Sequence, residues 1–300
     1  MRKIKRYGWI PDLPDQRDFV YAAPLAALRA LPPKKDLSGE CPPVYDQGEL
    51  GSCTANAIAA AHQFEQMKQQ RALVNGHSSS AGNQKSISQC PMTNDAAKPA
   101  MTNDSVFVPS RLFIYYNERA IEGTVNEDSG AMIRDGIKSV VKQGVCPETR
   151  STDSGQADWP YVIARFTKKP PKTCYTDAMN HQVVSYQRVT QTLNQMKGCL
   201  ASGYPFVFGF SVYESFETST VAKTGKVPMP RSGETMLGGH AVVAVGYNDA
   251  DQRFIVRNSW GSRWGKKGYC FMPYAYLTNP DLAADFWTIR MVEMPADMRA

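Results

Sequence analysis

The pattern of the chain changes near its middle, from helix-like periodicity to short β-rich runs. Apolar residues recur at helical spacing in 53–72, and helical patterns follow in 109–123 and 128–144. The second half has one short helical stretch, at 191–203. Its other segments are short runs rich in β-branched and aromatic residues, at 181–190, 204–213, 239–248, 253–260, 268–274 and 286–292. A helical half followed by a β half predicts an α+β fold with two packed subdomains and a cleft between them.

The 300-residue chain is expected to divide into three parts. Residues 1–30 are an N-terminal extension, in which prolines at 11 and 14 oppose regular helix. Residues 31–165 form a mainly helical domain, and residues 166–300 form a β-rich domain. Within the helical part, residues 76–106 are polar and of biased composition, which predicts a poorly ordered surface insert.

Composition and charge argue against several classes of protein. The net charge of +6 is spread along the chain, and its only dense basic run is "RKIKR" at the start, so we expect no nucleic-acid partner. No apolar run is long enough for a membrane span, and no apolar stretch follows the basic start as in a Sec-type signal peptide. The compartment therefore stays open, between the cytoplasm and secretion by another route.

The cysteines do not form a metal-binding or redox pattern. The chain has seven, and no C-x-x-C pair occurs, which argues against zinc knuckles and thioredoxin-type sites. Six of the seven could form up to three disulfides, and the sequence does not choose their connectivity.

One cysteine has a position that suggests reactivity. Cys53 ends the glycine-rich stretch "DQGELGSC" and begins the predicted helix at 53–72. A free cysteine is most often a small buried hydrophobe. A helix N-terminus, however, carries partial positive charge and favours the thiolate over the thiol. Cys53 is therefore a candidate nucleophile.

A nucleophilic thiol needs a base, and the chain has four histidines. His62 lies in the helix after Cys53, His77 lies in the polar insert, and His181 begins a strand in a polar context. His240 differs, because "GGHAVVAVGY" places it at the mouth of a buried strand, where two glycines allow another group to approach. A structural role is the alternative for this strand-end histidine.

The segment "RNSWGSRWGKKGY" supplies candidates that support an imidazole. Asn258 could accept a hydrogen bond from one ring nitrogen of His240 and leave the other nitrogen to face the sulfur. Trp260 could shield that hydrogen bond from water. The alternative interpretation is a β-turn with aromatic core anchors.

Together these pieces resemble papain-like cysteine peptidases of the C1 type. Four segments match in the family's order: "DQGELGSC", "YPFVFGFSVY", "GGHAVVAVGY" and "NSWGSRWGKKGY". The resemblance extends over about residues 31 to 292 with the insert as its main interruption. Each segment alone is moderate evidence, whereas the ordered set is specific. Finer features resemble the bacterial branch of the family, the xylellain-like enzymes.

The sequence also departs from the family pattern. Leu50 replaces the first cysteine of the C-G-[SA]-C-[WY] signature, so the disulfide that usually flanks the nucleophile cannot form. Thr54 replaces the aromatic residue after it. His240 lies farther from Cys53 than the usual window of about 130–150 residues, because the polar insert intervenes. The long helical prosegment of relatives is expected to be absent, since the extension is short.

The resemblance implies a papain-like two-domain fold. A helical domain carrying Cys53 would pack against an antiparallel, β-barrel-like domain carrying His240 and Asn258, with the active-site cleft between them. The Gln47 side chain and the Cys53 backbone N–H would form the oxyanion hole. The other supporting positions are Trp260, Gly51, Ser52 and Gly239.

The activity implied is hydrolysis of peptide bonds by a monomer, through a Cys–His–Asn set and a thioester acyl-enzyme. Cys53 and His240 would rest as thiolate and imidazolium, and neither a metal nor an organic cofactor would be needed. Two alternatives stay open: an acyltransferase or transglutaminase-like enzyme, and a non-catalytic peptide-binding protein on the same scaffold. The substrate, the subsite preference and the choice between endo- and exopeptidase action are not determined by the sequence.

The N-terminal extension is a candidate regulator. It carries Tyr7, Trp9, Phe19 and Tyr21 among prolines, and stiff aromatic segments lose little entropy on docking. We therefore expect residues 1–30 to be self-inhibitory and to lie on or beside the cleft. A structural belt on the β-rich domain is the alternative.

Overall fold

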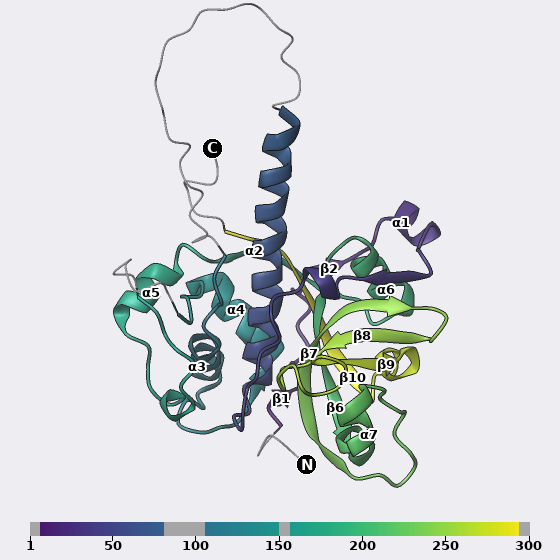
Figure 1. Ribbon diagram of the computed structural model, residues 1–300. Helices are drawn as coiled ribbons and strands as arrows, with labels where there is room; N and C mark the ends of the chain where they lie inside the picture. The colour runs from purple at the N-terminus through teal and green to yellow at the C-terminus, as the bar shows by residue number, and fades with distance from the viewer. Residues whose placement is uncertain (1–6, 81–105, 150–156, 294–300) are drawn as a thin grey trace, which may run out of the picture.

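The computed structural model describes residues 7–80, 106–149 and 157–293. One side of the molecule is mainly helical, and the other holds the sheet with several short helices around it (Figure 1). The helices are α1 (Leu25–Arg29), α2 (Cys53–Ser80), α3 (Arg111–Glu122), α4 (Ile133–Gln143), α5 (Lys172–Ala178), α6 (Leu193–Ala201), α7 (Ser219–Thr224) and α8 (Tyr274–Thr278). The strands are β1 (Trp9–Ile10), β2 (Val20–Tyr21), β3 (Lys34–Asp36), β4 (Ala131–Met132), β5 (Val183–Val189), β6 (Phe206–Tyr213), β7 (Met236–Asn248), β8 (Arg253–Arg257), β9 (Tyr269–Pro273) and β10 (Ala283–Val292). No helix in these ranges is long and apolar enough to span a membrane.

The sheet confirms the predicted β-rich half. Its order is β2-β5-β10-β6-β7-β8-β9, with β3 paired to β7, and every pair except β2–β5 is antiparallel. The order runs from β2 to β9 without closing, so the expected barrel-like domain is an open sheet. All residues of β6 except the last are buried, because helices cover one face and loops and short helices the other. β8 ends at Arg257, which leaves Asn258 in the loop that follows.

The long helix α2 lies between the helical side and the sheet. Every side chain from Cys53 to Gln66 is buried, so this part is covered all round and is not the one-sided amphipathic helix that the spacing predicted. Its small alanines allow both sides to approach closely. The helix also continues to Ser80, beyond the predicted end. Residues 76–80 are therefore helical, and residues 81–105 of the predicted insert lie outside the described residues.

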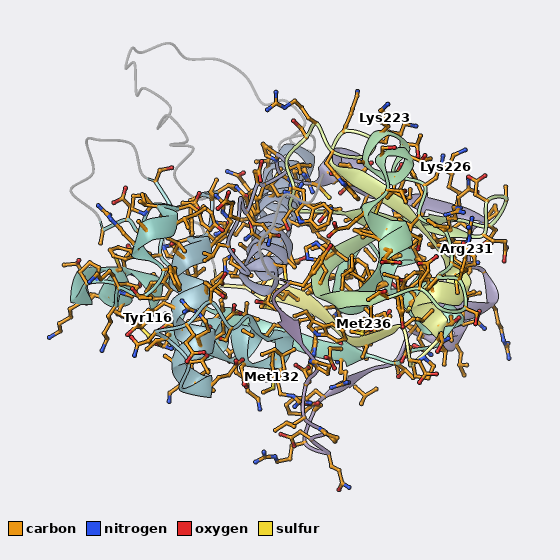
Figure 2. All side chains as sticks on the ribbon, turned by 90° about the horizontal axis from the view of Figure 1, so that it is seen from below. Tyr116, Met132, Lys223, Lys226, Arg231 and Met236 are labelled. Carbon is orange, nitrogen blue, oxygen red and sulfur yellow. The ribbon has the colours of Figure 1, made fainter. Side chains whose placement is uncertain are left out.

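The remaining helices follow their local signals. Ser110 caps α3 by accepting a hydrogen bond from the Phe113 N–H at 3.2 Å. Gly144 is the C-cap of α4, with a positive φ of 70° that glycine adopts readily. α4 begins later than its sequence pattern indicated, because Ala131 and Met132 before it form β4. Seen from below, Met132 lies on the helical side and Met236, at the start of β7, on the sheet side (Figure 2).

The N-terminal segment, defined as residues 7–21, connects the two sides. Trp9 and Ile10 in β1 pair in parallel with Ala131 and Met132 in β4, on the helical side. Farther along, Val20 and Tyr21 in β2 add to the sheet beside β5. Figure 1 shows the segment in purple, running from the bottom of the molecule along α2 to the sheet. Its second half therefore resembles the belt that was the alternative interpretation, and its first half lies where α2 begins. The three domain limits from the sequence stay predictions.

Candidate active site

Cys53 is the first residue of α2 and is fully buried. The turn before it is held by Asp128, which accepts from the Gly51 N–H at 3.0 and 3.1 Å through its two carboxylate oxygens. Asp128 also accepts from the Tyr115 hydroxyl at 2.5 Å. The thiol thus lies at a helix N-terminus whose approach is fixed from the helical side, as the sequence predicted for a nucleophile.

His240 lies in β7, opposite Phe210 of β6, and is also fully buried. Its Nε2 lies 2.8 Å from the Asn258 side-chain oxygen, while its Nδ1 has no hydrogen-bond partner within the described residues. The same Asn258 oxygen accepts from the Ser259 backbone N–H at 2.8 Å, which fixes the amide orientation. This geometry places the Nε2 proton toward Asn258 and leaves Nδ1 able to exchange a proton with another group.

Trp260 covers the His240–Asn258 contact. Its ring centroid lies 5.0 Å from that of His240, with an interplanar angle of 33°. Trp264 and Phe216 pack against the indole at 5.1 and 5.6 Å, both edge to face. The amide of Asn258 is only 2% exposed, so its hydrogen bond with the imidazole is kept from water.

Gln47 is held on three sides in the turn before Cys53. Its backbone N–H donates to the Ser259 carbonyl at 2.9 Å, and its side-chain oxygen accepts from the Ser259 hydroxyl at 2.6 Å. Its Nε2 donates to the Leu50 carbonyl at 2.9 Å. A primary amide has two N–H groups, so one remains for a further acceptor.

The other predicted supporting residues have identifiable partners. The Ser52 hydroxyl lies 2.6 Å from the Tyr161 hydroxyl, and Tyr161 also donates to the Gln47 carbonyl at 2.9 Å. Gly51 and Gly239 both contact the N-terminal segment. A Cβ on Gly239 would lie 2.5 Å from the Trp9 carbonyl oxygen, so a side chain there would displace the segment.

Gly8 of the N-terminal segment lies directly over Cys53. The backbone N–H groups of Gly8 and Ala241 hydrogen bond to the Cys53 sulfur, which also places the thiol beside the residue that follows His240. The Gly8 carbonyl accepts from the Ala131 N–H at 2.7 Å. A Cβ on Gly8 would lie 1.7 Å from the Gly51 carbonyl oxygen, so only glycine fits between the turn and the thiol.

Burial under this segment keeps both reactive groups neutral. Removal from water raises the pKa of the Cys53 thiol to about 12, although the Ala241 and Gly8 N–H groups oppose the rise. Burial lowers the pKa of His240 to about 4, against the opposing effect of Asn258. The expected thiolate–imidazolium pair is therefore not the state of the covered site, in which thiol and imidazole are both uncharged at neutral pH.

The other candidates lie elsewhere. His62 Nε2 lies 3.2 Å from the His181 carbonyl oxygen, and burial lowers the pKa of His62 to about 3, which fits a structural core histidine. His77 lies where side chains are not described. Within the described residues, no group of three or more His, Cys, Asp or Glu side chains could hold a metal ion.

Sequence reasoning missed several residues that shape the site. Asp128 supports the turn before Cys53, and Asp285 binds the Trp9 indole at 3.1 Å. Neither lies near the recognised segments in sequence. The glycines before His240 were a partial signal, because they indicated a close approach without identifying the approaching group as Trp9.

Comparison with known proteins agrees with this arrangement. Residues 122–280 match the family described as papain family cysteine protease. The chain is 44% identical over 258 residues to the uncharacterized peptidase C1-like protein L477 of Acanthamoeba polyphaga mimivirus, covering 83% of this chain and 70% of that protein. The crystal structure of xylellain, a cysteine protease from Xylella fastidiosa, is 45% identical with a TM-score of 0.75, covering 97% of this chain and 98% of that one. Digestive procathepsin L 3 of Tenebrio molitor, 16% identical with a TM-score of 0.58, shares the fold over 90% of this chain and 72% of its own.

Proposed function

The chain belongs to the papain family of cysteine proteases, on its bacterial, xylellain-like side, and from this premise we propose that Cys53, His240 and Asn258 hydrolyse peptide bonds through a thioester. The observation that carries the proposal is the position of the Cys53 sulfur. It hydrogen bonds to the backbone N–H of Ala241, the residue after His240, and Nε2 of His240 lies 2.8 Å from the Asn258 side-chain oxygen. The nucleophile therefore lies beside the residue that follows the base in β7, and the base is oriented by the Asn258 amide.

The first step requires the N-terminal segment to leave. Water then reaches the sulfur and the imidazole, and the burial that raises the pKa of Cys53 and lowers that of His240 is relieved. The thiol proton passes to Nδ1 of His240, which gives a thiolate at the N-terminus of α2 and an imidazolium held by Asn258.

The thiolate attacks the substrate carbonyl carbon and the carbonyl π electrons move to oxygen. The free N–H of the Gln47 amide and the backbone N–H of Cys53 donate to this oxyanion, and losing one such donor costs about 3–4 kcal/mol. The C–N bond then breaks, and the imidazolium gives its proton to the leaving amine. A thioester remains on Cys53, and His240 activates water to hydrolyse it and release the carboxylic acid.

The N-terminal segment acts in this proposal as a built-in inhibitor. Gly8 faces the thiol with its N–H, and its carbonyl is held by Ala131 at 2.7 Å, away from attack. Tyr7 packs beside His240 and Trp260, with the Tyr7 and His240 ring centroids 6.0 Å apart, and Trp9 packs against Gly239. The segment thus covers the site without presenting a cleavable bond.

The test is hydrolysis of a peptide mixture by the full chain and by Cys53→Ala and His240→Ala variants. Both variants should lose more than about a thousandfold in kcat/KM while melting at the wild-type temperature. Asn258→Ala should lose less, because the nucleophile remains and only the imidazole orientation suffers. Cys53→Ala activity within tenfold of wild type would contradict the proposal. A competing amine in the assay distinguishes hydrolysis from acyl transfer.

A further inference from the structure

We propose that Trp9 occupies the pocket that selects the substrate, and that this pocket prefers a tryptophan side chain close to the cleaved bond. The inference rests on the proposed peptidase function and adds a substrate class to it. Three features carry it: the space left by two glycines, a buried carboxylate at the end of that space, and the position of both beside Cys53.

Two glycines make room for the indole. A Cβ on Gly209, in the middle of β6, would lie 2.0 Å from Cε2 of Trp9, and a Cβ on Gly239, next to His240, would lie 2.6 Å from Cε3. Neither glycine has a positive φ, so the backbone does not require glycine there. Glycine inside a strand weakens it and often marks a close approach. These two glycines therefore leave space for a large flat ring.

A carboxylate lies at the end of this space. Asp285 is only 2% exposed, and its Oδ2 accepts from the Trp9 indole N–H at 3.1 Å and from the Asp12 backbone N–H at 2.8 Å. Its other oxygen, Oδ1, accepts from Arg188 at 3.0 Å. Asp285 has a left-handed φ of 58°, which few residues other than Gly, Asn and Asp adopt readily.

Release of the N-terminal segment removes both donors from Asp285 Oδ2. Water then reaches this oxygen, and a substrate side chain that fills the space displaces that water. A side chain that donates an N–H to Oδ2 is therefore favoured over one of the same size that leaves the oxygen without a donor. The donor must lie at the far end of a large side chain, because it has to cross the space between Gly209 and Gly239. An indole meets both conditions, as Trp9 itself shows.

The charge around the pocket favours a neutral donor over a basic one. Arg188 lies 3.0 Å from Asp285, 3.2 Å from Asp18 and 3.8 Å from Asp12. Asp12 and Asp18 belong to the N-terminal segment and leave with it. Arg188 then remains with Asp285, whose charge it offsets, so an arginine or lysine of the substrate gains little there.

The pocket lies one residue away from the reacting sulfur. Trp9 directly follows Gly8, whose N–H bonds to Cys53. A substrate backbone that replaces Gly8 over the thiol therefore brings one of its neighbouring side chains to the pocket. The segment and the substrate compete for the same space, and the side chain that the segment uses shows what fits.

The test uses the full chain as the double variant Trp9→Ala/Arg134→Ala. The first substitution removes the indole from the pocket, and the second removes hydrogen bonds that hold the N-terminal segment. Phe19→Ala/Arg134→Ala is the matched control, because Phe19 is an exposed aromatic of the same segment. Peptides carry Trp, 2-naphthylalanine or Ala at each position within three residues of a cleaved bond. At one position we expect kcat/KM for Trp to exceed that for 2-naphthylalanine, which has the size without the N–H, by about tenfold.

Two further substitutions in that background identify the pocket. Asp285→Asn should bring the Trp to 2-naphthylalanine ratio down to about one, because Arg188 attracts the amide oxygen and leaves the amide N–H groups facing the indole. Gly209→Ala should reduce the rates for both large side chains relative to Ala. Hydrolysis with no Trp preference, or a preference unchanged by both substitutions, overturns the inference and leaves the proposed function standing. Absence of any hydrolysis overturns both.

Discussion

Two buried arginine–carboxylate pairs in this molecule have similar geometry and different consequences. Arg111 and Glu148 lie 2.7 Å apart with side chains 9% and 12% exposed, and Arg134 and Asp18 lie 2.5 Å apart with side chains 5% and 9% exposed. Each guanidinium makes two hydrogen bonds to its carboxylate. The difference lies in what else each arginine holds.

Arg111 holds the turn that precedes Cys53. It donates to the Asp46 carbonyl at 3.0 Å and to the Asn56 side chain at 3.1 Å, and it stacks on the Tyr161 ring at 3.9 Å. Arg134 instead holds the N-terminal segment, because it donates to the Leu13 carbonyl as well as to Asp18. The first pair maintains the candidate site, and the second maintains its cover.

The comparison shows how one fold can hold its candidate site in place while the N-terminal segment that covers the site can dissociate. The side chains that bond directly to those of Gln47 and Ser52 are neutral, namely Ser259 and Tyr161. The segment is held largely through carboxylates, including Asp12 and Asp18 of its own and Asp285 of the sheet. The charges of Asp12 and Asp18 therefore act on the docking of the N-terminal segment.

The largest effect is expected for Arg111→Ala. It leaves the Glu148 carboxylate buried without its partner, which should lower the free energy of unfolding by about 3–5 kcal/mol. Peptidase activity should fall as well, since Asp46 and Asn56 lose a donor. Urea unfolding measures the first effect. The double replacement Arg111→Met/Glu148→Leu should recover much of the stability without the activity. Full activity in Arg111→Ala would show that this pair does not support the site.

Arg134→Ala should have a smaller effect on stability and the opposite effect on rate. Arg188 still pairs with Asp18 at 3.2 Å, so we expect a loss of about 1–2 kcal/mol. The segment should dissociate more often, and hydrolysis by the full chain should rise by about tenfold. Arg17→Ala is the control, because the Arg17 side chain is 87% exposed in its pair with Asp15 of the same segment. A decrease in rate, or an equal increase in the control, would refute a covering role for the segment.

A weaker effect is expected from pH through Asp12. Burial, with repulsion from Asp285, raises the pKa of Asp12 from 3.8 to about 6 when the segment is docked. Docking therefore takes up a proton between about pH 4 and pH 6, so it is favoured in acid and weakens as the pH rises through 6. Asp12→Asn mimics the protonated form. The rate of Cys53 modification in wild type relative to Asp12→Asn should rise several-fold from pH 4 to pH 7. A ratio that stays constant would contradict this.

Much of the candidate site could be predicted from the sequence because its parts have local signals. The glycine-rich turn before Cys53, the strand of His240 and the loop of Asn258 each lie in a short, recognisable segment. The N-terminal segment lacks such local signals. β1 has two residues, too few for a periodicity, and Trp9 meets Asp285 across 276 positions of the chain. Only the folded chain brings these residues together.

The most direct test of the account is the labelling of Cys53 in the full chain by an epoxide-type thiol inactivator, followed by peptide mapping. We predict slow labelling confined to Cys53 in the wild type, and labelling about tenfold faster at the same residue in Arg134→Ala. His240→Ala should suppress labelling in both backgrounds, because the thiolate then lacks its partner. Preferential labelling of another cysteine, or equal rates with and without Arg134, would contradict the account of Cys53 as a covered nucleophile.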